Sequence, residues 1–116
     1  MRLKLSNDKK MLFLPVVTTV MEEDYSKKSI ELLAWYTKNL TPVVFPSKLQ
    51  ENLERVHESP ERDQFGKQKY LADFEIKSIS LVAECKYLLV KVFSEQSLIF
   101  HIYDVTTGDR VLMLDN

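Results

Sequence analysis

The chain has 116 residues, of which 45% are apolar and 28% charged, and its formal net charge is −1. This length and composition exclude a disordered chain and fit a single domain with a buried core, which we expect to span residues 1–116. The even charge balance gives no bulk attraction to nucleic acid or anionic membranes, so we expect neither as a partner.

The single cysteine and the first residues limit the cellular setting. Cys85 excludes an intrachain disulfide and a multi-cysteine metal site, and we expect no metal or other cofactor. Residues 1–10 lack the apolar core of a secretory signal, and the longest apolar run, 11–17, is too short to span a membrane. We therefore expect an intracellular, cytoplasmic protein. With only two glycines, the chain should also contain few left-handed turns.

The first third of the chain predicts a hairpin and then a helix. Residues 3–5 alternate in polarity, and the β-branched run 11–21 follows a polar turn, so we expect an N-terminal hairpin with Pro15 at an edge or bulge. A helix is predicted from Asp24 or Ser26 to about Asn39, because its apolar residues recur at helical spacing.

A second helix and a loop are predicted next. Ser47 and Gln50 have the spacing of a capping box, and Leu49, Leu53 and Val56 form a narrow apolar stripe, so we expect a helix that ends at residues 59–60. The charged stretch 61–69 is predicted to be a flexible loop.

The last third of the chain predicts a β-meander. Apolar runs at 74–83, 87–93, 98–104 and 111–114 are separated by short polar turns, and a change of parity near Ser78 predicts a β-bulge. The overall prediction is an α+β fold, in which an antiparallel sheet of about five or six strands is packed by two α-helices on one face. The sheet would combine the N-terminal hairpin with the C-terminal meander.

The two central runs of the meander are apolar on both faces, which is unusual for a sheet with one solvated face. We interpret this as an interface through which a non-enzymatic interaction module or small complex subunit binds a protein partner or a second copy of itself. The candidate interface residues are Tyr87, Leu89, Phe93, Ile99, His101 and Tyr103.

An enzymatic alternative rests on Glu75-Ile76-Lys77. With Pro60-Glu61 upstream, this tripeptide resembles the signature of PD-(D/E)xK nucleases. The resemblance implies that Glu61 and Glu75 supply carboxylates for Mg²⁺ and that Lys77 orients a water. The opposing interpretation is that Glu75 and Lys77 form the solvated face of a strand. We expect Cys85 to be an unreactive turn cysteine, because the charge of Glu84 beside it raises the pKa of the thiol.

A further alternative rests on the turns of the meander. Tyr103-Asp104 ends the third predicted strand and Thr107-Gly108 leads to the fourth, so residues 76–114 resemble one blade of a WD-repeat propeller. A propeller needs at least four blades, so this resemblance implies that the chain is a terminal fragment of a larger propeller protein.

Overall fold

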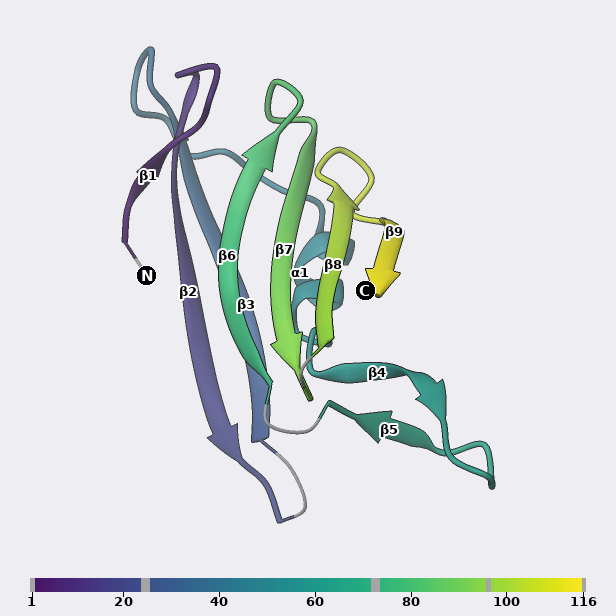
Figure 1. Ribbon diagram of the computed structural model, residues 1–116. Coiled ribbons are helices and arrows are strands. Elements are labelled where there is room, and N and C mark those ends of the chain that lie inside the picture. Colours follow the sequence, from purple (N-terminus) through teal and green to yellow (C-terminus); the bar gives the residue numbers. More distant parts are fainter. Residues whose placement is uncertain (1, 24–25, 72–73, 96, 116) are drawn as a thin grey trace.

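The computed structural model describes the backbone of residues 2–23, 26–71, 74–95 and 97–115, and all their side chains except those of residues 26, 60, 61 and 115. Within this part of the chain there are three antiparallel sheets and one short helix (Figure 1). Their strand orders are β1-β2-β3, β4-β5 and β6-β7-β8-β9. In chain order the elements are β1 (Lys4–Leu5), β2 (Met11–Met21), β3 (Ser26–Tyr36), α1 (Ser47–Leu53), β4 (Glu58–Arg62), β5 (Gln68–Tyr70), β6 (Glu75–Val82), β7 (Tyr87–Ser94), β8 (Ser97–Asp104) and β9 (Arg110–Asp115).

The N-terminal sheet is dominated by a long hairpin. Strands β2 and β3 pair without interruption from Met11↔Tyr36 to Met21↔Ser26. The predicted pairing of residues 3–5 with the following run is confirmed as β1 with β2. Pro15 lies beyond the segment of β2 that pairs with β1, where its missing N–H does not interrupt a three-stranded ladder.

The helix predicted from Asp24 or Ser26 to Asn39 is wrong, because this segment forms strand β3; Asp24 itself lies outside the described residues. Ile30, Leu32 and Ala34 are buried while the residues between them are more exposed, which is the two-residue period of a strand. Leu, Ala, Lys and Glu favour helix by only a few tenths of a kcal/mol each. The ladder with β2 and the burial of one face outweigh that preference.

The second predicted helix is confirmed but is shorter than expected. Helix α1 ends at Leu53, and its N-cap is Pro46 with no side-chain capping hydrogen bond, so the capping box predicted at Ser47 is wrong. The predicted apolar stripe is confirmed, since Leu49, Leu53 and Val56 are all buried. The helix is tied to the N-terminal sheet by its Gln50 side chain, whose Nε2 donates to a backbone carbonyl of β3.

The charged stretch predicted to be a loop forms much of the β4–β5 hairpin. The carboxylate of Asp63 accepts the backbone N–H groups of Phe65 and Lys67, both at 2.8 Å, and this holds the tip of the hairpin. Gly66 takes a left-handed φ of 79° at that tip. The hairpin projects away from the rest of the molecule (Figure 1), and Phe65 at its tip is 77% exposed.

The predicted meander is confirmed as the four-stranded sheet β6-β7-β8-β9. The bulge predicted near Ser78 is also confirmed, because the register of β6 against β7 shifts between Ile76 and Ser78. The centre of the inner face of this sheet is completely buried, because Ile79, Leu88, Val90 and Val92 are each 0% exposed.

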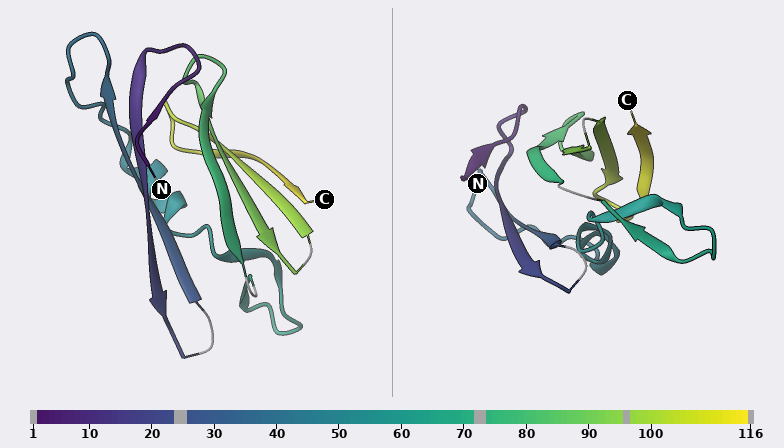
Figure 2. Two further views of the ribbon diagram at one scale, coloured as in Figure 1. Left: turned by 60° about the vertical axis from the view of Figure 1, so that its left-hand side comes forward. Right: turned by 60° about the horizontal axis from the view of Figure 1, so that its bottom comes forward.

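The β2–β3 hairpin and α1 cover that inner face together, so the main body has two layers (Figure 2). The predicted α+β class, with two helices packed on a single sheet, is therefore wrong. The protein is mostly β, and the layer assigned to helices is largely a second sheet. The core lies between the layers, and its buried apolar residues are Phe13, Ile30, Leu32, Ala34, Leu49, Leu53, Val56, Phe74, Ile79, Leu81, Cys85, Leu88, Val90, Val92, Ile99 and Tyr103.

The expectation of few left-handed turns is wrong, because residues other than glycine adopt positive φ. The β6–β7 turn contains three in succession, Ala83, Glu84 and Cys85, with φ of 53°, 58° and 65°. Each costs roughly 1–2 kcal/mol relative to right-handed backbone, so the strand pairing on either side must hold the turn.

Helix α1 meets the meander at the β8–β9 turn. Gly108 has a φ of 84°, and a Cβ added there would lie 2.5 Å from the backbone nitrogen of Leu49. The Asn52 side chain donates to the Gly108 carbonyl at 2.7 Å, and Lys48 forms an ion pair with Asp109. The absence of a side chain at residue 108 therefore allows the helix to pack against the sheet.

We predict that Gly108→Ala lowers the free energy of unfolding by more than about 2 kcal/mol, because it adds backbone strain and forces α1 away from the turn. Gly66→Ala is the matched control, since it also has a positive φ but no atom lies within 4 Å of the added Cβ. It should cost only about 1 kcal/mol. Urea unfolding followed by circular dichroism measures both, and equal losses would contradict the close packing at Gly108.

Candidate interaction surface

The register of the β7–β8 hairpin decides which side chains share the outer face of the meander. Ser94 pairs with Ser97, so odd-numbered residues of β7 lie opposite even-numbered residues of β8. Leu89 is thus opposite Ile102, and Lys91 is opposite Phe100. Directly opposed residues in an antiparallel pair point to the same side of the sheet.

This outer face is mainly apolar although it faces away from the core. The sheet face as a whole covers roughly 500 Å² in projection, since strands lie about 4.8 Å apart and residues rise about 3.3 Å each. This area includes the polar residues Glu75, Ser78, Ser80, Lys91 and Asp104, which lie on the same face. Large exposed apolar patches on monomers often mark interaction sites. We call this side of the sheet the outer meander face; its apolar residues are Val82, Tyr87, Leu89, Phe93, Leu98, Phe100, Ile102, Leu112 and Leu114.

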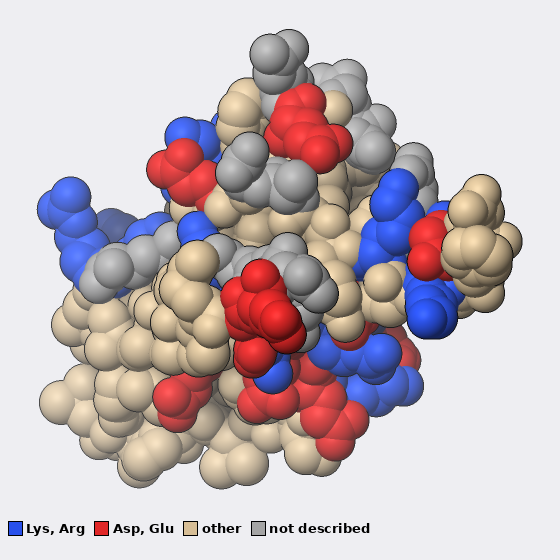
Figure 3. All heavy atoms as spheres, turned by 90° about the horizontal axis from the view of Figure 1, so that it is seen from below, with Lys and Arg blue, Asp and Glu red and all other residues tan. Residues whose placement is uncertain are grey.

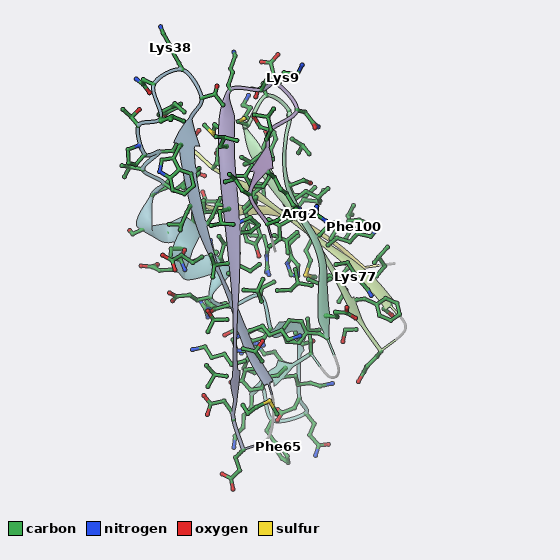
Figure 4. All side chains as sticks on the ribbon, turned by 90° about the vertical axis from the view of Figure 1, so that its left-hand side faces the viewer. Arg2, Lys9, Lys38, Phe65, Lys77 and Phe100 are labelled. Atoms are coloured by element: carbon green, nitrogen blue, oxygen red, sulfur yellow. The ribbon has the colours of Figure 1, made fainter. Side chains whose placement is uncertain are left out.

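Exposure on the outer meander face is greatest on β9 and at the end of β7. Phe93 is 37% exposed, Leu112 46% and Leu114 49%, while Leu89 and Phe100 in the middle are half-buried by their neighbours on the sheet. Phe100 points away from the β2–β3 hairpin (Figure 4). A second protein surface could therefore reach these side chains without any movement of the core.

Charged residues of both signs lie on the outer meander face: Lys77 and Lys91, and also Glu75 opposite Phe93 and Asp104 opposite Tyr87. The ammonium of Lys91 lies 6.0 Å from the centre of the Phe100 ring, near the middle of the sheet. The ammonium of Lys77 lies 5.7 Å from the Phe93 ring and also pairs with Glu75 at 3.1 Å. The described residues show no ion pair for Lys91, so its charge is available to a partner.

The two edges of the meander differ. Along the free edge of β6, the Lys4 ammonium donates to the Ile79 carbonyl at 2.9 Å and the Lys28 ammonium donates to the Phe74 carbonyl at 3.0 Å. Lysines at an edge block the addition of another strand. The free edge of β9 has no paired strand within the described part of the chain, and Val111 there is 51% exposed.

The structure divides the six predicted interface residues between two faces. Tyr87, Leu89 and Phe93 lie on the outer meander face, as the interpretation requires. The other three lie in the core: Ile99, His101 and Tyr103. The β8 residues that share the outer face with Tyr87, Leu89 and Phe93 are Leu98, Phe100 and Ile102, and sequence reasoning missed them. A two-residue turn that joins residues 94 and 97 places odd-numbered residues of β7 opposite even-numbered residues of β8, so predicting that turn length would have identified them.

His101 is the most unusual of the three core residues. It is 1% exposed, and neither ring nitrogen has a hydrogen-bond partner among the described residues. Its ring stacks on Tyr103 with the centroids 6.1 Å apart. Burial, with a smaller contribution from Arg110, lowers the pKa of His101 to about 4, so the imidazole is neutral at physiological pH.

Of the residues of the nuclease hypothesis, the structure describes only the side chains of Glu75 and Lys77. Glu75 and Lys77 lie at the start of β6, where they pair with each other at an exposed site. Glu61 lies on β4, in a different sheet, and its side chain is outside the described residues. No group of three potential metal ligands occurs among the described His, Cys, Asp and Glu residues. No contact in the structure favours the nuclease over the solvated-strand interpretation.

Cys85 lies beside a different carboxylate from the one expected. Its Sγ is 3.3 Å from Oδ1 of Asp8, in the turn between β1 and β2. Burial raises the pKa of the Cys85 thiol, and the Asp8 carboxylate raises it further. The thiol is therefore not activated as a nucleophile.

The local structure of the predicted blade turn is as the resemblance implied. Tyr103 and Asp104 end β8, the third strand of the meander. The Asp104 carboxylate accepts the backbone N–H groups of Thr106 at 2.8 Å and Thr107 at 3.1 Å, and Gly108 supplies the left-handed residue before β9. This is an Asx-type turn.

A polar cleft of about 370 Å³ lies between α1, the β4–β5 hairpin and the start of β9. Its two carboxylates are already paired, Asp109 with Lys48 and Glu58 with Arg55 at 3.3 Å. The remaining basic side chains of the cleft are solvent-exposed, so their charges are screened by water. These are Arg62 and Arg110.

Comparisons of this chain with protein-family models, curated proteins and solved structures find no match. The resemblances to nucleases and to propeller blades therefore have no support from a matching family. Within the described residues, no helix has the length and apolar character needed to cross a bilayer. The outer meander face is the feature that most needs a functional explanation.

We predict that His101→Leu leaves the protein as stable at pH 7 or makes it more stable, because it removes a buried ring with unpaired nitrogens. The wild type should lose stability as the pH falls from about 6.5 to about 4, since only the unfolded chain then protonates this histidine. The loss from this residue is on the order of 3 kcal/mol. Urea unfolding at several pH values measures it, and an equally steep decline in the variant would contradict the assignment.

Proposed function

We propose that this chain is a non-enzymatic protein–protein interaction module and that the outer meander face is its contact surface. The single observation that carries the proposal is a sheet whose inner face is covered by the β2–β3 hairpin and α1 but whose outer face is still mainly apolar. Removing apolar surface from water stabilises association by roughly 25 cal/mol per Å². A partner that covers this face would remove its nine apolar side chains from water.

The position of Lys91 defines the chemistry of the partner. This ammonium lies near the middle of the face, so a partner that covers the face also removes Lys91 from water. An unpaired buried charge costs several kcal/mol, which a carboxylate on the partner would offset. The partner surface should therefore be apolar and carry an acidic side chain opposite Lys91.

A second candidate function is that the chain is a piece of a WD-repeat-like propeller. Two observations favour it: the four-stranded order β6-β7-β8-β9, and the turn in which Tyr103 and Asp104 end the third strand. In a propeller, neighbouring sheets of the same polypeptide would cover the outer meander face.

We predict that Leu89→Glu weakens binding to a protein partner by about tenfold or more, because it places a charge in the middle of the apolar face. Val44→Glu is the matched control, since Val44 is 91% exposed and lies in the link before α1. Affinity capture from the source organism, with quantitative mass spectrometry, compares each variant with the wild type. Circular dichroism establishes that both variants fold.

Proteins retained by the wild type and by Val44→Glu, but lost with Leu89→Glu, would identify partners of this face. Phe100→Ser should lose the same proteins, and it removes apolar surface without adding charge. If both face variants retain every captured protein at wild-type levels and do not alter any self-association, the outer meander face is not the contact surface.

The propeller candidate predicts a broad, weakly cooperative thermal transition for this chain alone, because two of its apolar faces would lack their neighbours. Differential scanning calorimetry measures the transition. A sharp transition whose calorimetric and van't Hoff enthalpies agree would contradict this candidate, since it would indicate an independently folding unit.

A further inference from the structure

The protein has a second apolar face on the opposite side of the molecule. In the β1–β3 sheet, the side chains that point away from the core are mostly apolar, and Val20, Leu33 and Leu5 are 48%, 38% and 50% exposed. Viewed from below, the side formed by β2 and β3 carries few charged residues (Figure 3). We call it the outer hairpin face; its apolar residues are Leu5, Leu12, Leu14, Val16, Val20, Leu33 and Trp35.

The outer hairpin face carries one carboxylate in a central position. Glu31 lies near the middle of β3, opposite Val16 of β2, and both side chains are exposed. Lys27 is at the far end of the hairpin, opposite Val20. Among the described residues of these three strands, no other acidic side chain points outward on this face.

The two outer faces are complementary. Each belongs to an antiparallel sheet, each is mainly apolar, and each has one charge near its middle: Glu31 on one and Lys91 on the other. A two-fold contact centred on either charge would bring like charges together, Lys91 against Lys91 or Glu31 against Glu31. Like charges juxtaposed in an interface cost several kcal/mol.

We infer that the protein associates head to tail with a second copy of itself, the outer hairpin face of one copy packing on the outer meander face of the next. This inference rests on the proposed function of the outer meander face and names its partner. The contact repeats the packing inside each copy, where one face of the β1–β3 sheet covers the inner face of the meander. Such sheets pack about 10 Å apart.

The location of the two faces determines the kind of assembly. They lie on opposite sides of the two-layered body, so a copy can use both at once (Figure 2). A contact between unlike faces leaves one free face at each end, and it closes into a ring or grows into a filament. The assembly should therefore pass beyond a dimer as the concentration rises.

Charge reversal tests the pairing of Glu31 with Lys91. Sedimentation velocity of the wild type from micromolar to millimolar concentration should show species larger than a dimer. Glu31→Lys alone and Lys91→Glu alone should each weaken association by about tenfold or more, since each places like charges at every contact. The double variant E31K/K91E should associate as strongly as the wild type.

Mixing the two single variants supplies a second test, and a general loss of stability in the variants could not produce its expected result. In a head-to-tail assembly, E31K and K91E copies should alternate, because every contact between unlike variants again joins opposite charges. The mixture should therefore recover large species that neither variant forms alone. Thr18→Lys, on the same face but toward the end of the hairpin, is the control for added charge and should weaken association less.

Three results would overturn the inference. A wild type that remains monomeric at millimolar concentration would do so, as would a double variant no stronger than the singles. The third is an E31K variant that associates as strongly as the wild type while K91E does not, which would indicate contact between two outer meander faces. If the wild type is monomeric but Leu89→Glu still loses captured proteins, only the head-to-tail contact fails and the proposed function stands.

Discussion

The structure depends on the packing of the β2–β3 hairpin and α1 against the inner face of the meander. A two-stranded hairpin is marginal in water by itself, and a seven-residue helix has almost no independent stability. Both acquire their stability by covering side chains such as Leu88, Val90 and Val92. Burial of an aliphatic side chain of this size contributes about 1.5–3 kcal/mol, more than the net contribution of most single hydrogen bonds.

The same packing explains why an exposed apolar surface exists at all. A β-strand sends alternate side chains to opposite faces, and the meander strands have apolar residues at both sets of positions. One layer covers only one face, so the side chains around Leu89 and Phe100 remain outside. The hairpin repeats this arrangement, with Ile30 and Leu32 inside and Val16 and Leu33 outside. The result is a sandwich whose two outer faces are both mainly apolar, with Glu31 near the middle of one and Lys91 near the middle of the other.

Reasoning from sequence succeeded where the local pattern has one interpretation. The bulge near Ser78, the turn after Asp104 and the existence of α1 were all predicted correctly, because parity, turn chemistry and a short apolar stripe are local properties. It failed for β3, where leucines, alanine and charged residues suit a helix as well as a strand. It also assigned Ile99, His101 and Tyr103 to the interface, since polarity alone does not show which parity of β8 shares a face with Leu89.

What the sequence determined by itself is that the meander has two apolar faces, that the chain has one thiol with no partner thiol, and that its charges nearly balance. Only the tertiary structure decided which face is covered and by what. The pairing of β2 with β3 converts an ambiguous segment into a sheet, and the register from Ser94 to Ser97 brings Lys91 beside Phe100. The physical reason is that strand pairing is a contact between distant segments, and its energy does not appear in the pattern of either segment alone.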